Sequence, residues 1–259
     1  MLFGICTSVA NAPAAKAAGW DFIEEHVQNF LQGLVPDSQW NGDKVAAASP
    51  LPILAACCLV PGNLKIVGPE VDAKGLASYM ANVVARAKKC GIKTLVFGSG
   101  AARRVPDGWT REKAVEQILS FSQMCATLGA KHGVMIVIEH LNAGECNIVN
   151  SVAEGMTYVA KVNQPSFQCL ADCYHWWLEK EKPEDLRAAL PSIKHVHVSD
   201  LEGRLPPGES GKSDFRPFFR LLKEGGYNRT ISVEALGFED IAGKGPRVLA
   251  FLKKQWAEA

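Results

Sequence analysis

The chain has 259 residues, of which 47% are hydrophobic and 21% are charged, and its formal net charge is +1. This composition is typical of a globular protein with a large core, and the near-neutral charge excludes a broad electrostatic surface for nucleic acid or anionic membrane. No apolar run approaches the roughly 20 residues that span a bilayer. The N-terminal segment 1–19 faintly imitates a signal peptide but has no basic start, so we expect a first strand and loop there.

Short apolar runs alternate with longer amphipathic stretches along the chain. Continuous apolar runs are typical of strands buried on both faces of a parallel sheet. Eight of them predict strands, at 2–6, 19–24, 52–59, 94–100, 133–141, 167–173, 193–200 and 231–236.

Helical patterns lie between several of these runs. Apolar residues at helical spacing predict helices at 72–89, 110–131, 214–224 and 247–256. Thr110 is the expected N-cap of the second helix. Glycines near helix-to-strand transitions predict left-handed turns, at Gly91, Gly133 and Gly226. The segment 25–50 is less regular and predicts no definite element.

The fold that this order favours is a single α/β domain over 1–259, a parallel (β/α)8 TIM barrel. Eight strands can be counted, and about 250 residues is the usual size of such a barrel. An open doubly wound sheet is disfavoured because no GxGxxG follows the first strand.

The eight cysteines form no CxxC pair and no dense framework. Reduced thiols in a cytoplasmic protein are therefore favoured over disulfides or zinc binding. They are Cys6, Cys57, Cys58, Cys90, Cys125, Cys146, Cys169 and Cys173.

Polar side chains recur at or near the ends of four successive predicted strands. They are Glu139, Asp172, His197 and Glu234, with gaps of 172 − 139 = 33, 197 − 172 = 25 and 234 − 197 = 37 residues. One strand–helix unit of an eightfold barrel takes roughly 30 residues, so the four occupy one structural position in four units. In a barrel this position is the catalytic face.

Three carboxylates and one imidazole make a mostly hard ligand set. It suits Mn²⁺, Mg²⁺ or Co²⁺, with Zn²⁺ as an alternative. Without a cation, three buried carboxylates would repel one another and raise at least one pKa. The sequence therefore predicts one divalent metal ion, able to stabilise the negative oxygen formed when a proton leaves beside a carbonyl. The competing interpretation is four unrelated strand-end contacts.

The motifs IEHLNAGE, LADCYH, HVHVSDLEGRLPPGE and SVEAL resemble the xylose isomerase-like barrel superfamily, most of all its sugar isomerase and epimerase branch, which includes ketose 3-epimerases. The resemblance covers nearly the whole chain. It implies that Glu139, Asp172, His197 and Glu234 bind one divalent metal, and that the two glutamates shuttle the proton as the catalytic pair.

The resemblance also implies three substrate-binding residues. Glu145 matches a glutamate that hydrogen-bonds the catalytic region, His175 a substrate-binding histidine, and Arg204 a substrate-binding arginine before a Pro-Pro-Gly loop. The alternatives are a supporting contact for His175 and a surface ion pair for Arg204.

Other polar or aromatic residues are expected to have lesser roles. His195 is expected to face away from His197, and His140 not to be a direct ligand. One of Trp176 and Trp177 would wall a sugar pocket, unless both pack between helices. The segment FGSGAARR (97–104) is expected to be an ordinary turn with solvated arginines, with a substrate-binding loop as the alternative.

The functional hypothesis is a metal-dependent sugar isomerase or epimerase that abstracts a proton next to a carbonyl and passes through an enediolate. Its partner is a small keto-sugar; nucleic acid and membrane partners are not expected, and a homo-oligomer is left open. The alternative is a metal-dependent lyase or dehydratase on keto-sugars, 3-keto-glycosides or inososes.

A three-zinc DNA-repair endonuclease is disfavoured because the second and third strands end without histidine. A non-catalytic binding module is the remaining class.

Overall fold

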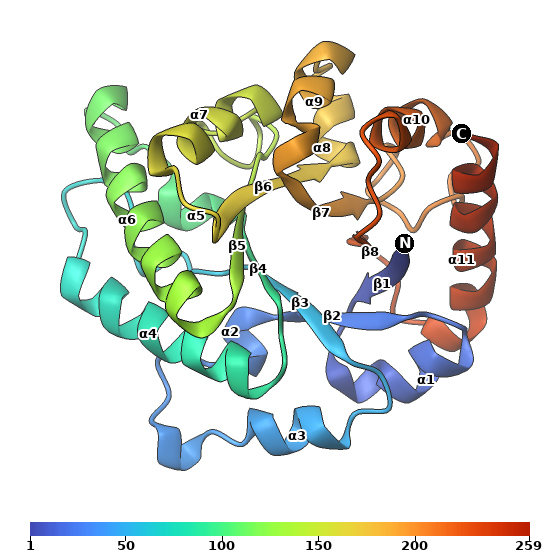
Figure 1. The fold of residues 1–259 in the computed structure, drawn as a ribbon, viewed down its shortest axis with the longest axis horizontal. Coiled ribbons are helices and arrows are strands. Elements are labelled where there is room, and N and C mark those ends of the chain that lie inside the picture. Colours follow the sequence, from blue (N-terminus) through green and yellow to red (C-terminus); the bar gives the residue numbers. More distant parts are fainter.

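A computed structural model describes residues 1–259 and shows a closed barrel of eight parallel strands with helices around it (Figure 1). Each strand pairs with its neighbour in sequence, and the last pairs with the first. This confirms the predicted (β/α)8 barrel. The strands are β1 (Leu2–Cys6), β2 (Phe22–His26), β3 (Ile53–Cys57), β4 (Thr94–Phe97), β5 (Met135–Glu139), β6 (Phe167–Asp172), β7 (Ile193–Val198) and β8 (Thr230–Val233).

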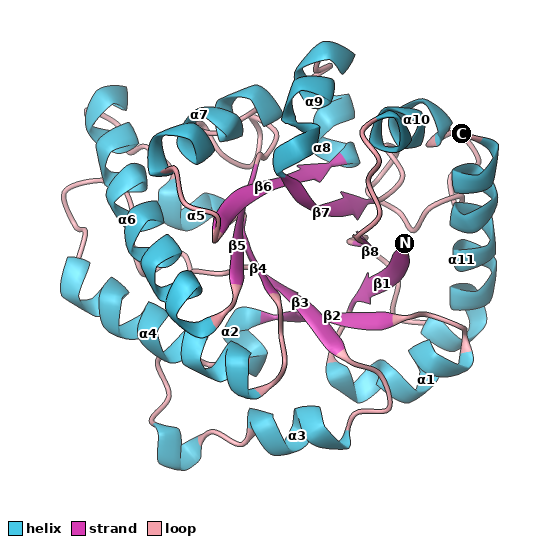
Figure 2. Ribbon diagram, viewed as in Figure 1, coloured by secondary structure: helices cyan, strands magenta, loops and turns pink.

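Helices form an outer ring around the strands (Figure 2). They are α1 (Ala12–Ala17), α2 (Val27–Phe30), α3 (Gly42–Ala48), α4 (Ala73–Lys89), α5 (Gly100–Arg103), α6 (Arg111–His132), α7 (Val152–Val162), α8 (Cys173–Leu178), α9 (Pro183–Ala189), α10 (Arg216–Glu224) and α11 (Ile241–Glu258). Three short 3-10 helices join them, at Val9–Asn11, Asp37–Gln39 and Leu190–Ser192.

The predicted helix boundaries agree with the structure at α4, α6 and α10. The Thr110 side chain accepts a hydrogen bond from the backbone N–H of Lys113, as an N-cap should. Gly91, Gly133 and Gly226 all have positive φ, at 76°, 69° and 66°. Helix α11 begins six residues before the predicted 247–256, because Pro246 lies inside it and obscures its first turns in the sequence.

Most strands are shorter than the apolar runs that predicted them, while β1 has the predicted bounds and β2 ends two residues beyond the run at 19–24. The run at 52–59 gives β3 only to Cys57, and the run at 94–100 gives β4 only to Phe97. The irregular segment 25–50 contains the end of β2 and the helices α2 and α3. The residues beyond each strand form the loops above the barrel, where the polar side chains gather.

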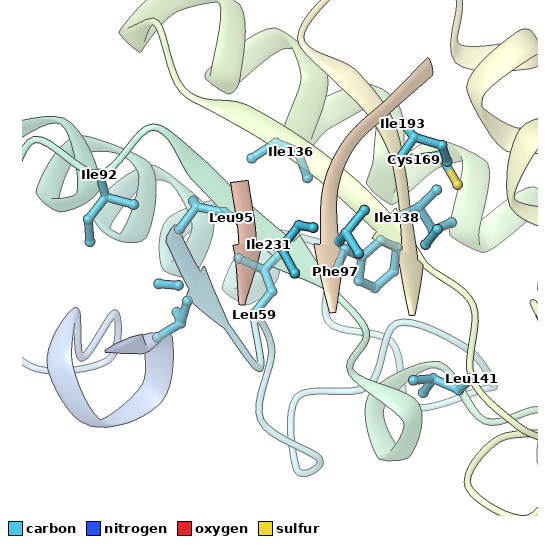
Figure 3. Packing of buried hydrophobic residues seen from close by; sticks show 14 of the residues in the cluster. Leu59, Ile92, Leu95, Phe97, Ile136, Ile138, Leu141, Cys169, Ile193 and Ile231 are labelled. Atoms are coloured by element: carbon cyan, nitrogen blue, oxygen red, sulfur yellow. The ribbon is translucent and has the colours of Figure 1, made fainter. Parts of the chain in front are cut away.

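Two layers of apolar packing hold the barrel. A cluster of 67 buried residues lies mainly between strands and helices, and Figure 3 shows part of it, including Leu95, Phe97, Ile136 and Ile138. A second cluster contains Cys57, Val96, Val137 and Leu170, whose strand positions alternate with those of the first.

The backbone of Gly4 in β1 lies directly against the ring of Phe22 in β2. A Cβ atom on Gly4 would overlap the ring of Phe22, so only glycine leaves room for that ring inside the barrel. None of the helices is long and apolar enough to cross a membrane. All eight cysteines are free.

Candidate active site

The structure brings the four predicted metal ligands together at the C-terminal end of the barrel. Glu139 and Asp172 end β5 and β6, His197 is the next-to-last residue of β7, and Glu234 directly follows β8. One donor atom from each lies within 4.8 Å of those of the other three. Glu139, Asp172 and His197 are buried, and Glu234 is partly buried. The convergence follows from the alternation of side chains, which points these four residues of neighbouring strands to the inside.

His197 contacts carboxylates through both ring nitrogens. Its Nδ1 lies 3.0 Å from Glu139 Oε1 and 3.4 Å from Glu234 Oε2, while its Nε2 lies 3.0 Å from Glu24 Oε1. The other oxygen of Glu24 lies 2.7 Å from His195 Nε2. Glu24 thus joins the two histidines in a fully buried network beneath the site.

The prediction that His195 faces away from His197 is wrong. Residues two apart in a strand point to the same face, so both imidazoles point into the barrel. The His195 Nδ1 atom also lies 2.7 Å from Thr230 Oγ1. Glu24 was missed as a functional residue, although its place at the end of the predicted strand 19–24 is the signal that identified the other four.

The charges of the network favour ionised carboxylates. Burial alone would raise the pKa of Glu24, but His197 and His195 outweigh it and hold that pKa well below its usual range. Burial would likewise raise the pKa of Glu234, but His197 and Arg204 lower it to about 2. For His197, burial would lower the pKa, and the carboxylates of Glu24 and Glu234 instead raise it well above its usual value.

Arg204 lies beside the four residues, on the loop after β7. Its guanidinium donates to Glu234 and, over 3.0 Å, to Glu145 Oε1, and it lies 3.6 Å from Asp172 Oδ2. It also stacks 4.9 Å from the centre of the Tyr174 ring. The Arg204 backbone has a φ of 52°, a left-handed conformation that is uncommon for a residue other than glycine. A strained residue that bridges two acidic groups in the site is typical of a functional position.

His175 is fully buried below the site. Its Nδ1 accepts the backbone N–H of Asn142 over 3.2 Å, and its Nε2 lies 3.7 Å from Asp172 Oδ2 without a hydrogen bond. It is not among the residues that line the adjoining cavity. The Asn142 side chain in turn donates to Glu145 Oε1 over 2.8 Å. His175, Asn142 and Glu145 therefore form one hydrogen-bonded group.

His140 and the two tryptophans serve the surrounding structure. His140 Nε2 accepts the backbone N–H of Asp172 over 3.2 Å, and its Nδ1 lies 2.9 Å from a Glu181 carboxylate oxygen. Trp176 and Trp177 pack against phenylalanines with ring centres 5.7 Å and 5.1 Å apart. Helix packing therefore accounts for both tryptophans.

Two of the four residues, Glu139 and Glu234, line an open cavity of about 670 Å³. Glu139, Glu234 and Arg204 form its polar wall, and the glycine-rich stretch 98–101 after β4 forms part of the other side. A second cavity of about 420 Å³ is lined by residues of β1 to β3 and shares Cys58 and Glu234 with the first. Volumes in this range are usual for small-molecule sites.

The loop after β4 is more than the predicted turn. A Cβ atom on Gly98 would overlap the carboxylate of Glu139, so glycine is needed there. Arg103 is not solvated but fully buried, and it donates to the backbone carbonyls of Phe97 and Glu139. It thereby holds the C-terminal ends of β4 and β5 in place. Only Arg104 is exposed, as expected.

The donor set fits a divalent metal ion. Three carboxylates and one imidazole nitrogen converge on a partly buried point beside an open cavity, and the single guanidinium nearby does not balance their charge. The His197 imidazole is already oriented by Glu24, as metal-binding histidines usually are by a carboxylate.

Comparisons with known proteins agree with this architecture. L-ribulose 3-epimerase of Methylomonas sp. (strain DH-1) is 25% identical over 95% of this chain and 84% of its own length. The structure of D-psicose 3-epimerase with D-tagatose from Clostridium cellulolyticum H10 superposes with a TM-score of 0.86 at 16% identity, over 99% of both chains. The IOLI protein with a binding zinc atom superposes with a TM-score of 0.72 at 18% identity, over 100% of this chain and 97% of its own. The family model for xylose isomerase-like TIM barrels matches residues 12–255, and the chain therefore belongs to that family.

Proposed function

We propose that the chain is a divalent-metal-dependent sugar isomerase or epimerase that acts on a ketose or keto-sugar. The observation that carries the proposal is the convergence of Glu139, Asp172, His197 and Glu234 within 4.8 Å, with both glutamates in the wall of the 670 Å³ cavity. A sugar in that cavity would contact both glutamate carboxylates and lie next to the point on which the four residues converge.

The four residues would hold one ion, with Mn²⁺ as the first choice and Mg²⁺, Co²⁺ or Zn²⁺ as alternatives. A bound ion would supply Lewis-acid stabilisation of the oxygen charge that develops on the substrate. The zinc atom named for the IOLI protein, which has the same fold, supports metal binding but does not select the metal for this chain.

Proton transfer is assigned to the two glutamates. One carboxylate removes the proton beside the substrate carbonyl, which gives an enediolate, and the other returns a proton to the opposite face for epimerisation. The low pKa of Glu234 keeps it ionised at neutral pH, the form in which a carboxylate can bind a metal or accept a proton. Isomerisation would need a base on only one face.

Arg204 and Glu145 are assigned to substrate binding. The Arg204 guanidinium lies in the cavity wall beside Glu234, where it can stabilise negative charge on the substrate. Glu145 fixes the other edge of that guanidinium and lines the same cavity. His175 is also assigned to substrate binding, through its hydrogen bond with Asn142, although it lies below the cavity wall and does not line the cavity.

Incubation of the Mn²⁺-loaded protein with ketoses, inososes and 3-keto-glycosides in D₂O, followed by NMR, tests the proposal. We expect conversion of a ketose or keto-sugar with conserved mass and deuterium at one carbon. Release of water or an alcohol with the same substrates would instead assign a lyase or dehydratase. Absence of turnover across the whole panel would contradict the proposal.

A further inference from the structure

Two cysteines lie on the inner wall of the barrel next to the proposed metal site. Cys6 ends β1 and Cys57 ends β3. Their Sγ atoms and a carboxylate oxygen of Glu234 all lie within 4.8 Å of one another. Both cysteines line the 420 Å³ cavity, so the pair can be reached from outside the barrel.

The positions of the two strands disfavour a disulfide between these cysteines. Strand β2 lies between β1 and β3, with Cys6 level with Glu24, and Cys57 level with His26. At the usual strand spacing the two Cα atoms are about 9 Å apart or more. A disulfide needs Cα atoms within about 7 Å. The two cysteines therefore remain free thiols whose sulfur atoms lie close together.

A metal ion can join sulfur atoms that a disulfide cannot. Zinc binds thiolate sulfur at about 2.3 Å in tetrahedral geometry, so two sulfurs on one ion are ~3.8 Å apart. The Cys6 and Cys57 sulfurs and a Glu234 oxygen lie within 4.8 Å of one another, so a movement of ~1 Å or less brings them to that spacing. Two thiolates and one carboxylate form a site that prefers a soft or borderline ion, unlike the oxygen-rich set beside it.

We infer that Cys6, Cys57 and Glu234 form a second metal site, which takes a thiophilic divalent cation such as Zn²⁺ or Cd²⁺. The ion enters through the 420 Å³ cavity, and the two thiol protons leave to solvent as the metal–sulfur bonds form. Because Glu234 belongs to both ligand sets, an ion at the thiol site withdraws a ligand from the oxygen-rich site. The two sites therefore compete for Glu234.

Titration of the full-length protein with Cd²⁺, followed by ultraviolet absorption, tests the thiol site directly. Sulfur-to-cadmium charge transfer should appear and saturate at about one ion per chain. Cys6→Ser and Cys57→Ser should each lose most of this absorption. Cys125→Ser is the matched control, because Cys125 is buried in α6 away from the barrel interior, and it should keep the absorption in full. Absorption that is unchanged in Cys6→Ser and Cys57→Ser would overturn the inference.

Two further measurements need no cysteine variant. A ¹¹³Cd NMR spectrum of the unmodified protein should show one resonance in the range of sulfur ligation, and a resonance typical of oxygen and nitrogen ligands alone would overturn the inference. Mn²⁺ binding, followed by electron paramagnetic resonance, should weaken when one equivalent of Cd²⁺ is present. Loss of Mn²⁺ without any cadmium–sulfur signal would show simple replacement at the oxygen-rich site, which also contradicts the inference. These readouts do not depend on the proposed sugar chemistry.

Discussion

Glu24 and His197 face each other inside the barrel, with Glu24 Oε1 3.0 Å from His197 Nε2 and neither side chain exposed. The contact directs the other nitrogen of His197, Nδ1, toward Glu139 and Glu234. A proton on Nε2 donates to Glu24 and leaves Nδ1 free to coordinate a metal. Contacts of this kind fix the orientation of metal-binding histidines and raise their basicity.

Glu24→Gln should weaken metal binding although Glu24 is not one of the four ligands. The amide keeps the size of the side chain but removes the charge that supports His197, and loss of such a carboxylate typically costs 10- to 100-fold in metal affinity. Mn²⁺ titration by electron paramagnetic resonance measures the change. Glu25→Gln is the matched control, because the Glu25 carboxylate accepts hydrogen bonds from the backbone N–H groups of Val9 and His26 and from Ser8, and none from His197. Equal affinity in the Glu24 variant and the wild type would show that Glu24 does not orient His197.

Purified protein should carry about one divalent ion at the four-residue site, and its binding should release a proton. The carboxylates around His197 raise its pKa well above the usual value, so the imidazole is protonated in the metal-free chain at neutral pH. Coordination requires the neutral ring, and affinity should therefore rise with pH until the pKa of His197 is passed. Calorimetry in buffers of different ionisation enthalpy counts the protons. Full activity after exhaustive removal of metal would contradict the assignment of the site.

Much of the barrel could be predicted because its strands are short, continuous apolar runs at regular spacing. The same regularity located Glu139, Asp172, His197 and Glu234, since a polar residue at the end of a buried strand is conspicuous. The short helices α8 and α9 were missed, because six and seven residues are too few to show a helical period. Helix α2, of four residues, was missed for the same reason.

The sequence patterns could not predict which side chains of distant strands contact one another. Nothing in the local sequence of Glu24 shows that two histidines more than 170 residues away enclose it. The burial of Arg103 depends on two carbonyl groups at the ends of β4 and β5, which only the closed barrel brings together. Such pairings are set by strand register, which apolar patterns do not specify.

Gly98→Ala should disturb the metal site without unfolding the chain. The added methyl group would overlap the Glu139 carboxylate and force that side chain to move, so Mn²⁺ affinity and turnover should both fall. Gly155→Ala is a suitable control, because its new Cβ would meet no atom closer than Cys169 Sγ, at 3.3 Å, and no residue of the metal site. Thermal melting confirms that both variants fold. Unchanged Mn²⁺ affinity in Gly98→Ala would mean that Glu139 can adopt another position at no cost.

Arg204→Ala should retain the metal and lose turnover. The guanidinium lies in the cavity wall against Glu234, and removal of a group that stabilises developing charge costs roughly 10²-fold or more in kcat/KM. His175→Ala should act in the same direction, through Asn142 and Asp172. Arg187→Ala, on the exposed face of α9, serves as the control. Wild-type kinetics in both the Arg204 and His175 variants would remove these residues from the substrate site.

The two-carboxylate mechanism predicts that solvent deuterium enters the product. If Glu139 and Glu234 flank the reacting carbon, the proton taken by one carboxylate exchanges with water before a proton returns. Glu234→Gln keeps a carbonyl oxygen for the metal but removes the base, so metal binding should weaken yet remain detectable while turnover is nearly abolished. Glu139→Gln should allow partial deuterium exchange without net conversion, because only one face of the substrate is then served. NMR of the substrate pool in D₂O measures exchange and conversion together. Conversion without deuterium uptake in any condition would indicate a hydride shift or a fully shielded proton transfer. That result would leave the assignment of the metal ligands unchanged, but it would exclude the proton shuttle between Glu139 and Glu234.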